Sequence, residues 1–366
     1  MKIVIFGPVY PFRGGIAHYT TILSATFRER SHDVLVISFK RQYPRLLFPG
    51  GSDRDPSQRP LARVPTEYLI DSLQPCSWIA AARRAIREHP DVVVMQWWTP
   101  FWALAWFVIG TLLWLSRQGI CIVYICHNVL PHEIRPWDRW LARFALHWGH
   151  AFIVQSEQEH ARFNMLLGRN TVYVVPQPPY TVFAQQRPSK EEARRVLGLS
   201  PNIILLLFFG FVRPYKGLDD VILALPEVIK LYNNVHLLIV GEFWESESKY
   251  RTLIEKLGLQ QYVHIENRYV PNEEIPYYFA AADFFVLSHR VITGSGSLQI
   301  ARAFGLPVID RSILGKWAQT PDDLAKCIIT CLRAGKPLDM TTDSVSWDHL
   351  AEVIENIVIS SKIRCA

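Results

Sequence analysis

The chain has 366 residues, a formal net charge of +6, and 49% hydrophobic against 20% charged residues. This balance excludes an intrinsically disordered chain, and the length is sufficient for two domains of roughly 150–200 residues. Residues 1–180 carry 19 Lys and Arg against 12 Asp and Glu, a net +7, whereas the remainder carries 20 against 21, a net −1. The basic first half suggests an anionic partner, such as a membrane surface or a phosphorylated substrate, and no nucleic-acid-binding motif is present.

The cysteines and the first residues indicate a cytoplasmic protein. The six cysteines include no C-x-x-C pair and most lie in apolar runs, which favours buried thiols over disulfides or a metal site. The N-terminus has no apolar segment of signal-peptide length before its Gly-Gly loop.

Residues 99–116 are uncharged and just long enough to be a membrane-span candidate. They lie between two strand-like runs, residues 92–98 and 120–126, which a span would place on opposite sides of the membrane. We therefore expect the crossover helix of an α/β fold, either packed in the core or touching a membrane interface with aromatic rings such as Trp106 and Trp114.

The first half alternates strands and helices. An apolar strand at residues 2–6, a Pro/Gly-rich loop and a helix at 16–30 form an opening that is typical of a doubly wound nucleotide-binding domain. Without a G-x-G-x-x-G fingerprint, this opening predicts no dinucleotide cofactor. The other elements expected are strands at 33–39, 91–98, 120–126, 151–154 and 173–176, a helix at 78–89, an irregular basic excursion at 40–65, and a helical run containing His147 and His150.

The second half repeats this alternation after a Pro-rich, charged bridge at residues 177–200. Strands are expected at 203–209, 236–241, 263–266, 284–287 and 307–310, and helices at 219–230, 246–257, 272–281 and 297–304. The helix at 272–281 is expected to begin with an acidic first turn, Glu273 and Glu274.

The whole pattern predicts the α/β class, with two Rossmann-like parallel-sheet domains that face each other across a cleft. The first domain is expected at residues 1–180 and the second, nucleotide-binding domain at 181–345. Residues 346–366 are expected to form a C-terminal helix that packs back toward the first domain.

The candidate site residues follow the predicted strands. Arg213 and Lys216 lie between the strand at 203–209 and the next helix, with Gly210 and Gly217 beside them. Two cations next to a helix N-terminus suit a diphosphate, because the unpaired N–H groups and the helix dipole attract anions there. The alternative is an ordinary loop with two solvated cations.

Three further junctions are of the same kind. The Gly14-Gly15 loop precedes the first helix, and Thr293-Gly294-Ser295-Gly296 precedes a later helix, where it offers a second diphosphate cradle. His127 stands at the carboxyl end of a strand, where open parallel sheets bind ligands. A ligand with its diphosphate on the second domain and its reacting group toward the first would use all four junctions.

Together these motifs resemble the retaining glycosyltransferases of family 4, which have the two-Rossmann-domain GT-B architecture. The likeness covers nearly the whole chain, through Gly14-Gly15, His127-Asn128, Ser156-Glu157, Gly210-x-x-Arg213-Pro-Tyr-Lys216-Gly217, Val240-Gly241-Glu242, Ala282-Asp283, Thr293–Gly296 and Phe304–Ile309. It implies transfer of a sugar from a UDP- or GDP-linked donor to an acceptor hydroxyl, without a cofactor or a metal ion.

The resemblance also implies roles for particular residues. Arg213 and Lys216 hold the donor diphosphate and offset the charge on the leaving nucleotide, and His127 lies near the donor sugar. The Gly14-Gly15 loop approaches the phosphates or the acceptor, and the chain near Arg268-Tyr269 meets the base. The catalytic residues implied are His127, Arg213 and Lys216, and the donor-binding residues are Gly14, Gly15, Gly210, Arg213, Lys216, Glu242, Arg268, Tyr269, Thr293, Gly294, Ser295, Gly296 and Gln299.

The sequence departs from the family pattern at two positions. Members carry two glutamates separated by seven residues, and both positions are isoleucine here, Ile292 and Ile300. Gln299 or Glu242 could take over the ribose contact, and Thr293 with the following Gly-Ser-Gly backbone could hold the donor sugar. The departure leaves retention of configuration open and motivates an alternative function, a non-catalytic sugar-nucleotide or glycolipid binding module. An α/β oxidoreductase is disfavoured by the missing fingerprint.

The acceptor is suggested by two features of the first half. Its basic charge and the aromatic stretch at residues 99–116 favour a lipid-linked or polysaccharide acceptor and peripheral contact with an anionic membrane. We therefore expect polysaccharide or glycolipid assembly at the inner face of the membrane, with no nucleic-acid partner.

Overall fold

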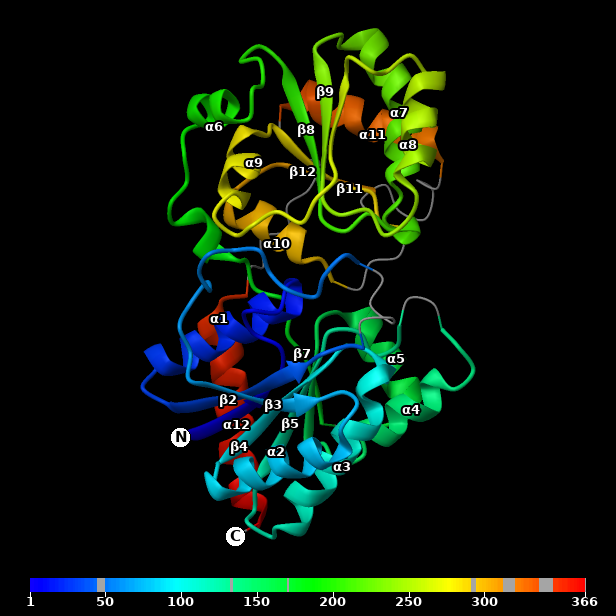
Figure 1. Cartoon of the computed structure of the whole chain (residues 1–366). Helices are drawn as coiled ribbons and strands as arrows, with labels where there is room; N and C mark the ends of the chain where they lie inside the picture. The colour runs from blue at the N-terminus through cyan, green and yellow to red at the C-terminus, as the bar shows by residue number, and fades with distance from the viewer. Residues whose placement is uncertain are drawn as a thin grey trace. The chain divides into compact units, whose positions relative to one another are not determined.

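The computed structural model describes residues 1–44, 50–131, 134–169, 171–290, 294–311, 320–335 and 345–365. The chain divides into two compact units (Figure 1). The first unit contains Met1–Asp55, Arg59–Pro178 and the C-terminal helix. The second contains Pro56–Gln58 and the chain that follows from Pro179.

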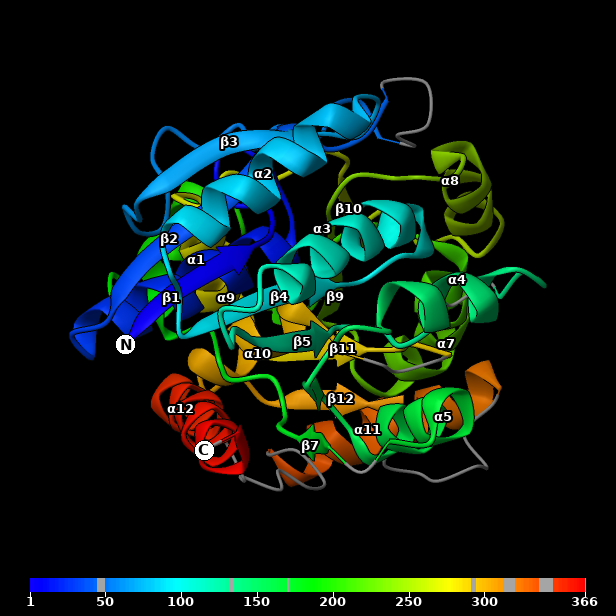
Figure 2. The ribbon, with the colours of Figure 1, turned by 90° about the horizontal axis from the view of Figure 1, so that it is seen from below.

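The first unit is built on a seven-stranded parallel sheet with the order β3-β2-β1-β4-β5-β6-β7. Its strands are β1 (Lys2–Phe6), β2 (Asp33–Arg41), β3 (Thr66–Asp71), β4 (Val92–Trp97), β5 (Cys121–Cys126), β6 (Ala151–Val154) and β7 (Val172–Val174). Its helices are α1 (Gly15–Glu29), α2 (Pro75–Arg87), the 3-10 turn η2 (Pro100–Trp102), α3 (Ala103–Leu115), α4 (Asp138–Ala145), α5 (Glu157–Leu167) and the C-terminal α12 (Trp347–Cys365). Because the strand order reverses between β1 and β4, right-handed crossovers place α1 and α3 on opposite faces of the sheet (Figure 2).

The second unit is built on a five-stranded parallel sheet with the order β10-β9-β8-β11-β12, which reverses between β8 and β11. Its strands are β8 (Ile204–Phe209), β9 (Val235–Val240), β10 (Val263–Glu266), β11 (Phe284–Leu287) and β12 (Val308–Asp310). Its helices are η3 (Thr181–Ala184), α6 (Lys190–Val196), η4 (Pro214–Lys216), α7 (Leu218–Leu231), α8 (Glu247–Lys256), α9 (Ile275–Ala281), α10 (Gly296–Ala303) and α11 (Pro321–Ala334). Two doubly wound sheets confirm the predicted α/β class with two Rossmann-like domains.

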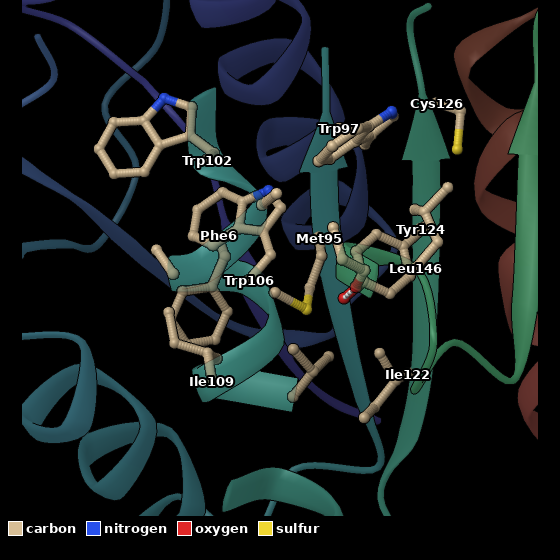
Figure 3. Close-up of a cluster of buried hydrophobic side chains, with 14 of the residues drawn as sticks. Phe6, Met95, Trp97, Trp102, Trp106, Ile109, Ile122, Tyr124, Cys126 and Leu146 are labelled. Atoms are coloured by element: carbon tan, nitrogen blue, oxygen red, sulfur yellow. Dashed lines mark hydrogen bonds between the residues drawn. The ribbon is translucent and has the colours of Figure 1, made fainter. Parts of the chain in front are cut away.

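The uncharged stretch at 99–116 forms η2 and α3, the crossover between β4 and β5. Trp102, Trp106 and Ile109 recur at helical spacing and are buried against the sheet (Figure 3). The indole Nε1 of Trp106 donates to the Gln96 carbonyl at 2.9 Å, so burial leaves this polar atom satisfied. Within the described parts of the chain, no helix has the length and apolar character needed to cross a bilayer.

The cysteines agree with the prediction of buried thiols. Cys121, Cys126, Cys327 and Cys331 are buried, whereas Cys76 is exposed. None of these five cysteines forms a disulfide in the described part of the chain, and Cys365 is outside the side chains that the structure describes.

The sequence missed β3, α5, α6 and α11, of which helix α5 (Glu157–Leu167) follows β6 where no helix was expected. No strand was expected between residues 40 and 78, but Thr66–Asp71 forms the edge strand β3, with register irregularities against β2. The bridge expected at 177–200 contains α6, whose Ser189 side chain accepts from the Glu192 N–H. Helix α11 was also not expected, although Thr320 and Asp323 form a capping box at its start.

Two helix boundaries were predicted wrongly. His147 and His150 lie in the turn between α4 and β6, where His150 Nδ1 accepts from the Ile122 N–H at 3.0 Å. Helix α9 begins at Ile275, so Glu273 and Glu274 precede it. The reason is Pro276, which lacks an N–H and is tolerated in the first turn but not in the interior of a helix.

The C-terminal helix α12 packs on α1. The carboxylate of Glu355 accepts from Arg30 Nε and Nη2 at 2.8 and 2.9 Å, and it lies 2.8 Å from His32 Nε2. The hydrogen bonds from Arg30 outweigh burial and lower the pKa of Glu355 to about 2. At the start of the same helix, the Trp347 ring packs edge-on to Tyr19 at 5.0 Å.

We expect Glu355→Gln to destabilise the first unit by about 2 kcal/mol at neutral pH, because the Arg30 guanidinium loses its charged partner. Since the pKa of Glu355 falls from 4.5 to about 2 on folding, its ionised form stabilises the fold above pH 4.5. This contribution is lost as the pH falls toward 2. The midpoints of urea unfolding measured for wild type and Glu355→Gln should therefore converge in acid. Glu352→Gln is the control. That carboxylate also lies near Arg30, at 3.6 Å, but it is half-exposed, so its loss should change stability little. Equal midpoints for wild type and Glu355→Gln at neutral pH would contradict this account.

Candidate functional site

The reversal of strand order in each sheet marks a candidate ligand site. In doubly wound sheets, ligands bind outside the carboxyl ends of the strands at this reversal. In the second unit the reversal lies between β8 and β11, so it is flanked by the loop at residues 210–217 and by the chain from Ser288 onward. These are the loops in which the sequence places Gly210, Arg213 and Lys216.

Two glycines hold the loop after β8 in a close-packed arrangement. Gly210 has φ +113°, and a Cβ there would lie 2.9 Å from Lys216 Nζ. Gly241 has φ +143°, and a Cβ there would lie 2.1 Å from the Gly210 carbonyl oxygen. Only glycine fits at both positions, and the Gly210 backbone therefore lies directly beside the lysine ammonium.

Lys216 is a buried cation that has no anionic partner among the described residues. Three Lys and Arg residues in the described ranges are buried, and two of them, Arg194 and Arg311, pair with carboxylates. Lys216 is only 8% exposed and has no hydrogen bond or ion pair from its ammonium within those ranges. Burial, together with the positive charge of Arg213, lowers the pKa of Lys216 to about 8. A buried ammonium of this kind is stabilised by an anion.

The backbone of the same loop is fixed from the β11 side. Ser288 Oγ donates to the Lys216 carbonyl at 2.7 Å, and the Arg290 N–H donates to the Tyr215 carbonyl at 2.8 Å. A Cβ on Gly217, which has φ +65°, would lie 2.6 Å from the Ser288 carbonyl oxygen. The two loops at the strand reversal are therefore packed directly on each other.

Arg213 is held by aromatic rings. Its guanidinium carbon lies 5.1 Å from the Trp244 ring centroid and 5.6 Å from that of Tyr215, and it has no ion pair with any residue described. Such contacts position the guanidinium without neutralising its charge. The charge of Arg213 therefore adds to that of Lys216 at the strand reversal.

An aromatic cluster surrounds Arg213. Phe211 contacts Trp244 and Tyr269, with ring centroids 4.6 and 5.8 Å apart. Neither Phe211 nor Trp244 was expected at the site from the sequence. The available signal was their position just after the carboxyl ends of β8 and β9.

The two residues predicted to meet the base differ in their surroundings. Tyr269 belongs to the aromatic cluster, whereas the Arg268 guanidinium donates to Glu266 at 2.6 Å, to the Tyr278 hydroxyl at 2.9 Å and to Glu274. The Arg268 side chain is therefore occupied by partners in the second unit. Contact with the base remains a prediction for its backbone. Glu242 contributes its backbone carbonyl, which accepts from the Val212 N–H at 2.9 Å.

The start of α10 lies beside the same loop, because a Cβ on Gly210 would be 3.8 Å from Ser297 Oγ. Ser295 caps the helix by accepting from the Leu298 N–H at 3.3 Å, with Gly294 and Gly296 on either side. Gln299 is buried, and its carboxamide oxygen has no hydrogen-bond partner in the described chain. Ile300 is also buried. Ile292 and Thr293 lie outside the described residues.

In the first unit, His127 leaves the carboxyl end of β5 with its ring buried. Its Nε2 lies 2.7 Å from Gln96 Oε1, and the Gln155 carboxamide nitrogen lies 3.1 Å from its Nδ1. These partners assign the ring proton to Nε2. Burial lowers the pKa of His127 to about 3, so the ring is neutral at ordinary pH. Tyr19 packs edge-on against it at 4.7 Å.

The loop that carries His127 is fixed by a residue that the sequence analysis missed. Glu159 on α5 is fully buried, accepts from the Val129 N–H at 2.6 Å and pairs with Arg162 at 2.7 Å. The neighbouring residues of the predicted motif act otherwise: Ser156 caps α5 and Glu157 is exposed. The i, i+3 spacing of Glu159 and Arg162 on a helix was the only available signal.

The Gly14-Gly15 loop leads into α1 in the first unit. Gly14 has φ +104° and no side chain caps the helix. Among the residues that the structure describes, no atom lies within 4 Å of a Cβ built at either glycine. Among the residues described, no group of three or more His, Cys, Asp and Glu could hold a metal ion, and metal independence stays a prediction.

The chain matches two protein families in succession. Residues 14–178 match the glycosyl transferase 4-like domain, and residues 189–316 match the glycosyl transferases group 1. The chain therefore belongs to the GT-B glycosyltransferases that combine these two domains, as the resemblance to family 4 predicted.

Curated proteins match the chain at low sequence identity. A D-inositol 3-phosphate glycosyltransferase of Actinosynnema mirum is 25% identical over 74% of this chain and 68% of that protein. Another from Segniliparus rotundus is 28% identical over 60% of this chain and only 52% of that protein. A GDP-mannose:glycolipid 4-beta-D-mannosyltransferase of Xanthomonas campestris pv. campestris is 26% identical over 71% of this chain and 70% of that protein.

Solved structures share the fold. Anabaena Alr3699/HepE in complex with UDP has a TM-score of 0.66 at 19% identity, covering 100% of this chain and 98% of that chain. The catalytic domain of starch synthase IV from Arabidopsis thaliana, bound to ADP and acarbose, has a TM-score of 0.67 at 14% identity, covering 98% and 99%.

We expect His127 to stay neutral, with its proton on Nε2, throughout the pH range in which an ordinary histidine of pKa 6.5 titrates. The reason is burial, which disfavours the imidazolium. Nitrogen NMR of the imidazole ring measures both the tautomer and the charge, and His127→Gln identifies the signal by removing it. Protonation of this signal near pH 6.5 would contradict the buried, amide-bound arrangement.

Proposed function

We propose that this glycosyltransferase transfers a sugar from a UDP- or GDP-linked donor to an acceptor hydroxyl. Its setting is polysaccharide or glycolipid assembly at the cytoplasmic face of a membrane. The observation that carries the proposal is the pair Arg213 and Lys216, two cations without a carboxylate partner among the described residues, at the strand reversal of the second unit. A diphosphate provides the two adjacent anionic groups that such a pair binds.

The same pair accounts for rate enhancement. When the sugar leaves, negative charge develops on the nucleotide diphosphate, and a fixed guanidinium and ammonium stabilise it in the transition state. A divalent cation performs this task in metal-dependent enzymes. We therefore infer that Arg213 and Lys216 take its place and that the reaction needs no metal ion.

His127 has a different role in this proposal. With a pKa of about 3 it is too weak a base to accept a proton effectively at neutral pH. We infer that it contributes to the donor-sugar end of the site as a neutral ring, with both of its nitrogens hydrogen-bonded to amides of its own unit in the free protein. Its contacts with the Gln96 and Gln155 amides set the tautomer that it presents.

Gln299 is proposed to replace the missing ribose-binding glutamate. Its support is a buried carboxamide oxygen without a partner in the described chain, on the helix next to Gly210. Retention of configuration follows from the family resemblance and is part of the proposal. Comparison of the anomeric configuration of donor and product by NMR tests it.

The relatives support a nucleotide-diphosphate donor. One curated relative uses GDP-mannose by name, and the Anabaena structures hold UDP or UDP-glucose. A second candidate, a non-catalytic sugar-nucleotide or glycolipid binding module, is favoured by Ile300, which is buried where the family carries a glutamate.

We expect Arg213→Ala and Lys216→Ala each to weaken UDP or GDP binding by roughly 10- to 100-fold, because each removes a charged contact to the diphosphate. Thermal shift with UDP, GDP and NAD identifies the ligand class, and calorimetry measures the affinities. Arg251→Ala is the matched control, since that exposed arginine is paired with Glu247.

Unchanged affinity in both site variants, or stabilisation by NAD alone, would overturn the proposed function. Turnover separates the enzyme from the binding module. Nucleotide released from UDP- or GDP-sugars upon addition of acceptor membranes supports the enzyme. Tight donor binding without release for any donor and acceptor supports the module.

We also expect diphosphate affinity to depend on the charge of Lys216. Its pKa in the free protein is about 8, and a bound anion raises it, so binding above pH 8 requires proton uptake. Affinity should level off below about pH 7 and, above pH 8, fall by up to about tenfold for each pH unit. Calorimetric Kd values across this range measure the effect, and the nucleotide β-phosphate does not interfere because it ionises near pH 6. Lys216→Met should bind weakly without this dependence, and a wild-type profile that stays flat would contradict the assignment.

A further inference from the structure

The first unit carries an exposed surface on α3 and α4 that the proposed reaction does not use. These helices pack on each other (Figure 2). We call this surface the aromatic–arginine surface. Its apolar members are Leu104, Phe107, Trp114, Leu115, Trp137, Trp140, Phe144 and Trp148, and its basic members are Arg117, Arg135, Arg139 and Arg143.

Five of the rings form one continuous row that runs from α4 to α3. Trp140 stacks on Phe144 at 5.5 Å, and Phe144 stacks on Phe107 of α3 at 3.6 Å. The row continues through Trp148, which stacks on Trp114 at 4.7 Å. The rings therefore belong to a single surface rather than to scattered positions.

Both ends of this row are exposed. Trp140 is 64% exposed and Trp114 is 54% exposed, and Leu104, Leu115 and Trp137 are exposed to a similar extent. Leu104, Phe107, Trp114 and Leu115 follow the helical spacing of one stripe of α3, opposite the buried Trp102 and Trp106. A contiguous exposed apolar patch of this kind marks an interaction site.

The charges beside the row have one sign. Arg117, Arg135 and Arg139 are exposed and have no ion pair in the described chain, and Arg143 donates only to the Leu166 carbonyl. The single described carboxylate of α4, Asp138, is buried and accepts from the Arg135 N–H at 2.7 Å. Helix α3 contains no charged residue at all.

We propose that the aromatic–arginine surface docks the enzyme on a bilayer that contains anionic phospholipid. Tryptophan rings favour the boundary between headgroups and acyl chains, and arginines beside them pair with lipid phosphates. The apolar row and the basic flank then act together, as stable peripheral attachment requires two signals. This inference rests on the proposed function, which places the reaction at a membrane, and it names the surface that binds that membrane.

The charge pattern favours lipid over a second copy of the chain. In a symmetric dimer through this surface, the same arginines of both copies would be brought together, and like charges repel. An anionic bilayer complements them instead.

Vesicle sedimentation of the full chain tests the proposal. We expect binding to phosphatidylcholine vesicles that contain phosphatidylglycerol, and much weaker binding to phosphatidylcholine alone. Trp114→Ala with Trp140→Ala, and Arg117→Glu with Arg139→Glu, should each reduce binding to the anionic vesicles roughly tenfold or more. Leu231→Ala with Arg333→Glu removes an exposed leucine and reverses an exposed arginine of the second unit, and it should bind as wild type does.

Melting temperature and UDP- or GDP-induced thermal shift, measured without vesicles, separate this proposal from the proposed function. The nucleotide-induced shift should be unchanged in the surface variants, because every substituted side chain lies outside the donor site, and a cooperative melting transition shows that the variants remain folded. If the wild type does not bind UDP or GDP, the proposed function is contradicted. The docking surface is then tested by vesicle binding alone. Three results would overturn the docking surface. The wild type does not bind anionic vesicles, the surface variants bind them as well as the wild type does, or the wild type is a dimer that the surface substitutions dissociate.

Discussion

The candidate site depends on one constraint, a lysine ammonium buried beside a peptide backbone. Lys216 lies against Gly210 after β8, and Gly241 after β9 lies against the Gly210 carbonyl. Both close approaches need glycine, because a Cβ at either position would collide with its neighbour. Burial makes the charged form of the lysine costly until an anion arrives, and Arg213 adds to this cost. In the proposed function, selectivity for a diphosphate and stabilisation of the departing nucleotide both follow from this arrangement, since the same charge serves binding and catalysis.

The sequence predicted the parts of the site that are local. Gly210, Arg213 and Lys216 occupy one short loop after an apolar strand, so strand period and glycine positions sufficed to find them. The family membership and the fold class were also predicted, and both are confirmed. The support around these residues was not predictable. Trp244 reaches Arg213 from another strand end and Glu159 reaches the His127 loop from another helix, and no sequence spacing encodes such contacts.

The missed elements have physical explanations of the same kind. The edge strand β3 pairs on one side only and follows a Pro- and Arg-rich loop, so its β-rich residues gave a weak signal. The short helix α6 depends on the Ser189 cap within a charged segment that has little apolar periodicity. In α9 a single proline moved the start of the helix past two glutamates, which overrode the preference of acidic residues for a first turn.

The first unit is discontinuous, because it takes its last helix from the end of the chain. Trp347 at the start of α12 packs on Tyr19, and Tyr19 packs on His127. During synthesis from the N-terminus, the ribosome therefore releases all of the second unit before the first can be completed. Of the two units, the one that starts first along the chain is therefore completed second, and the surroundings of His127 gain the contact between Trp347 and Tyr19 only after the second unit has been synthesised.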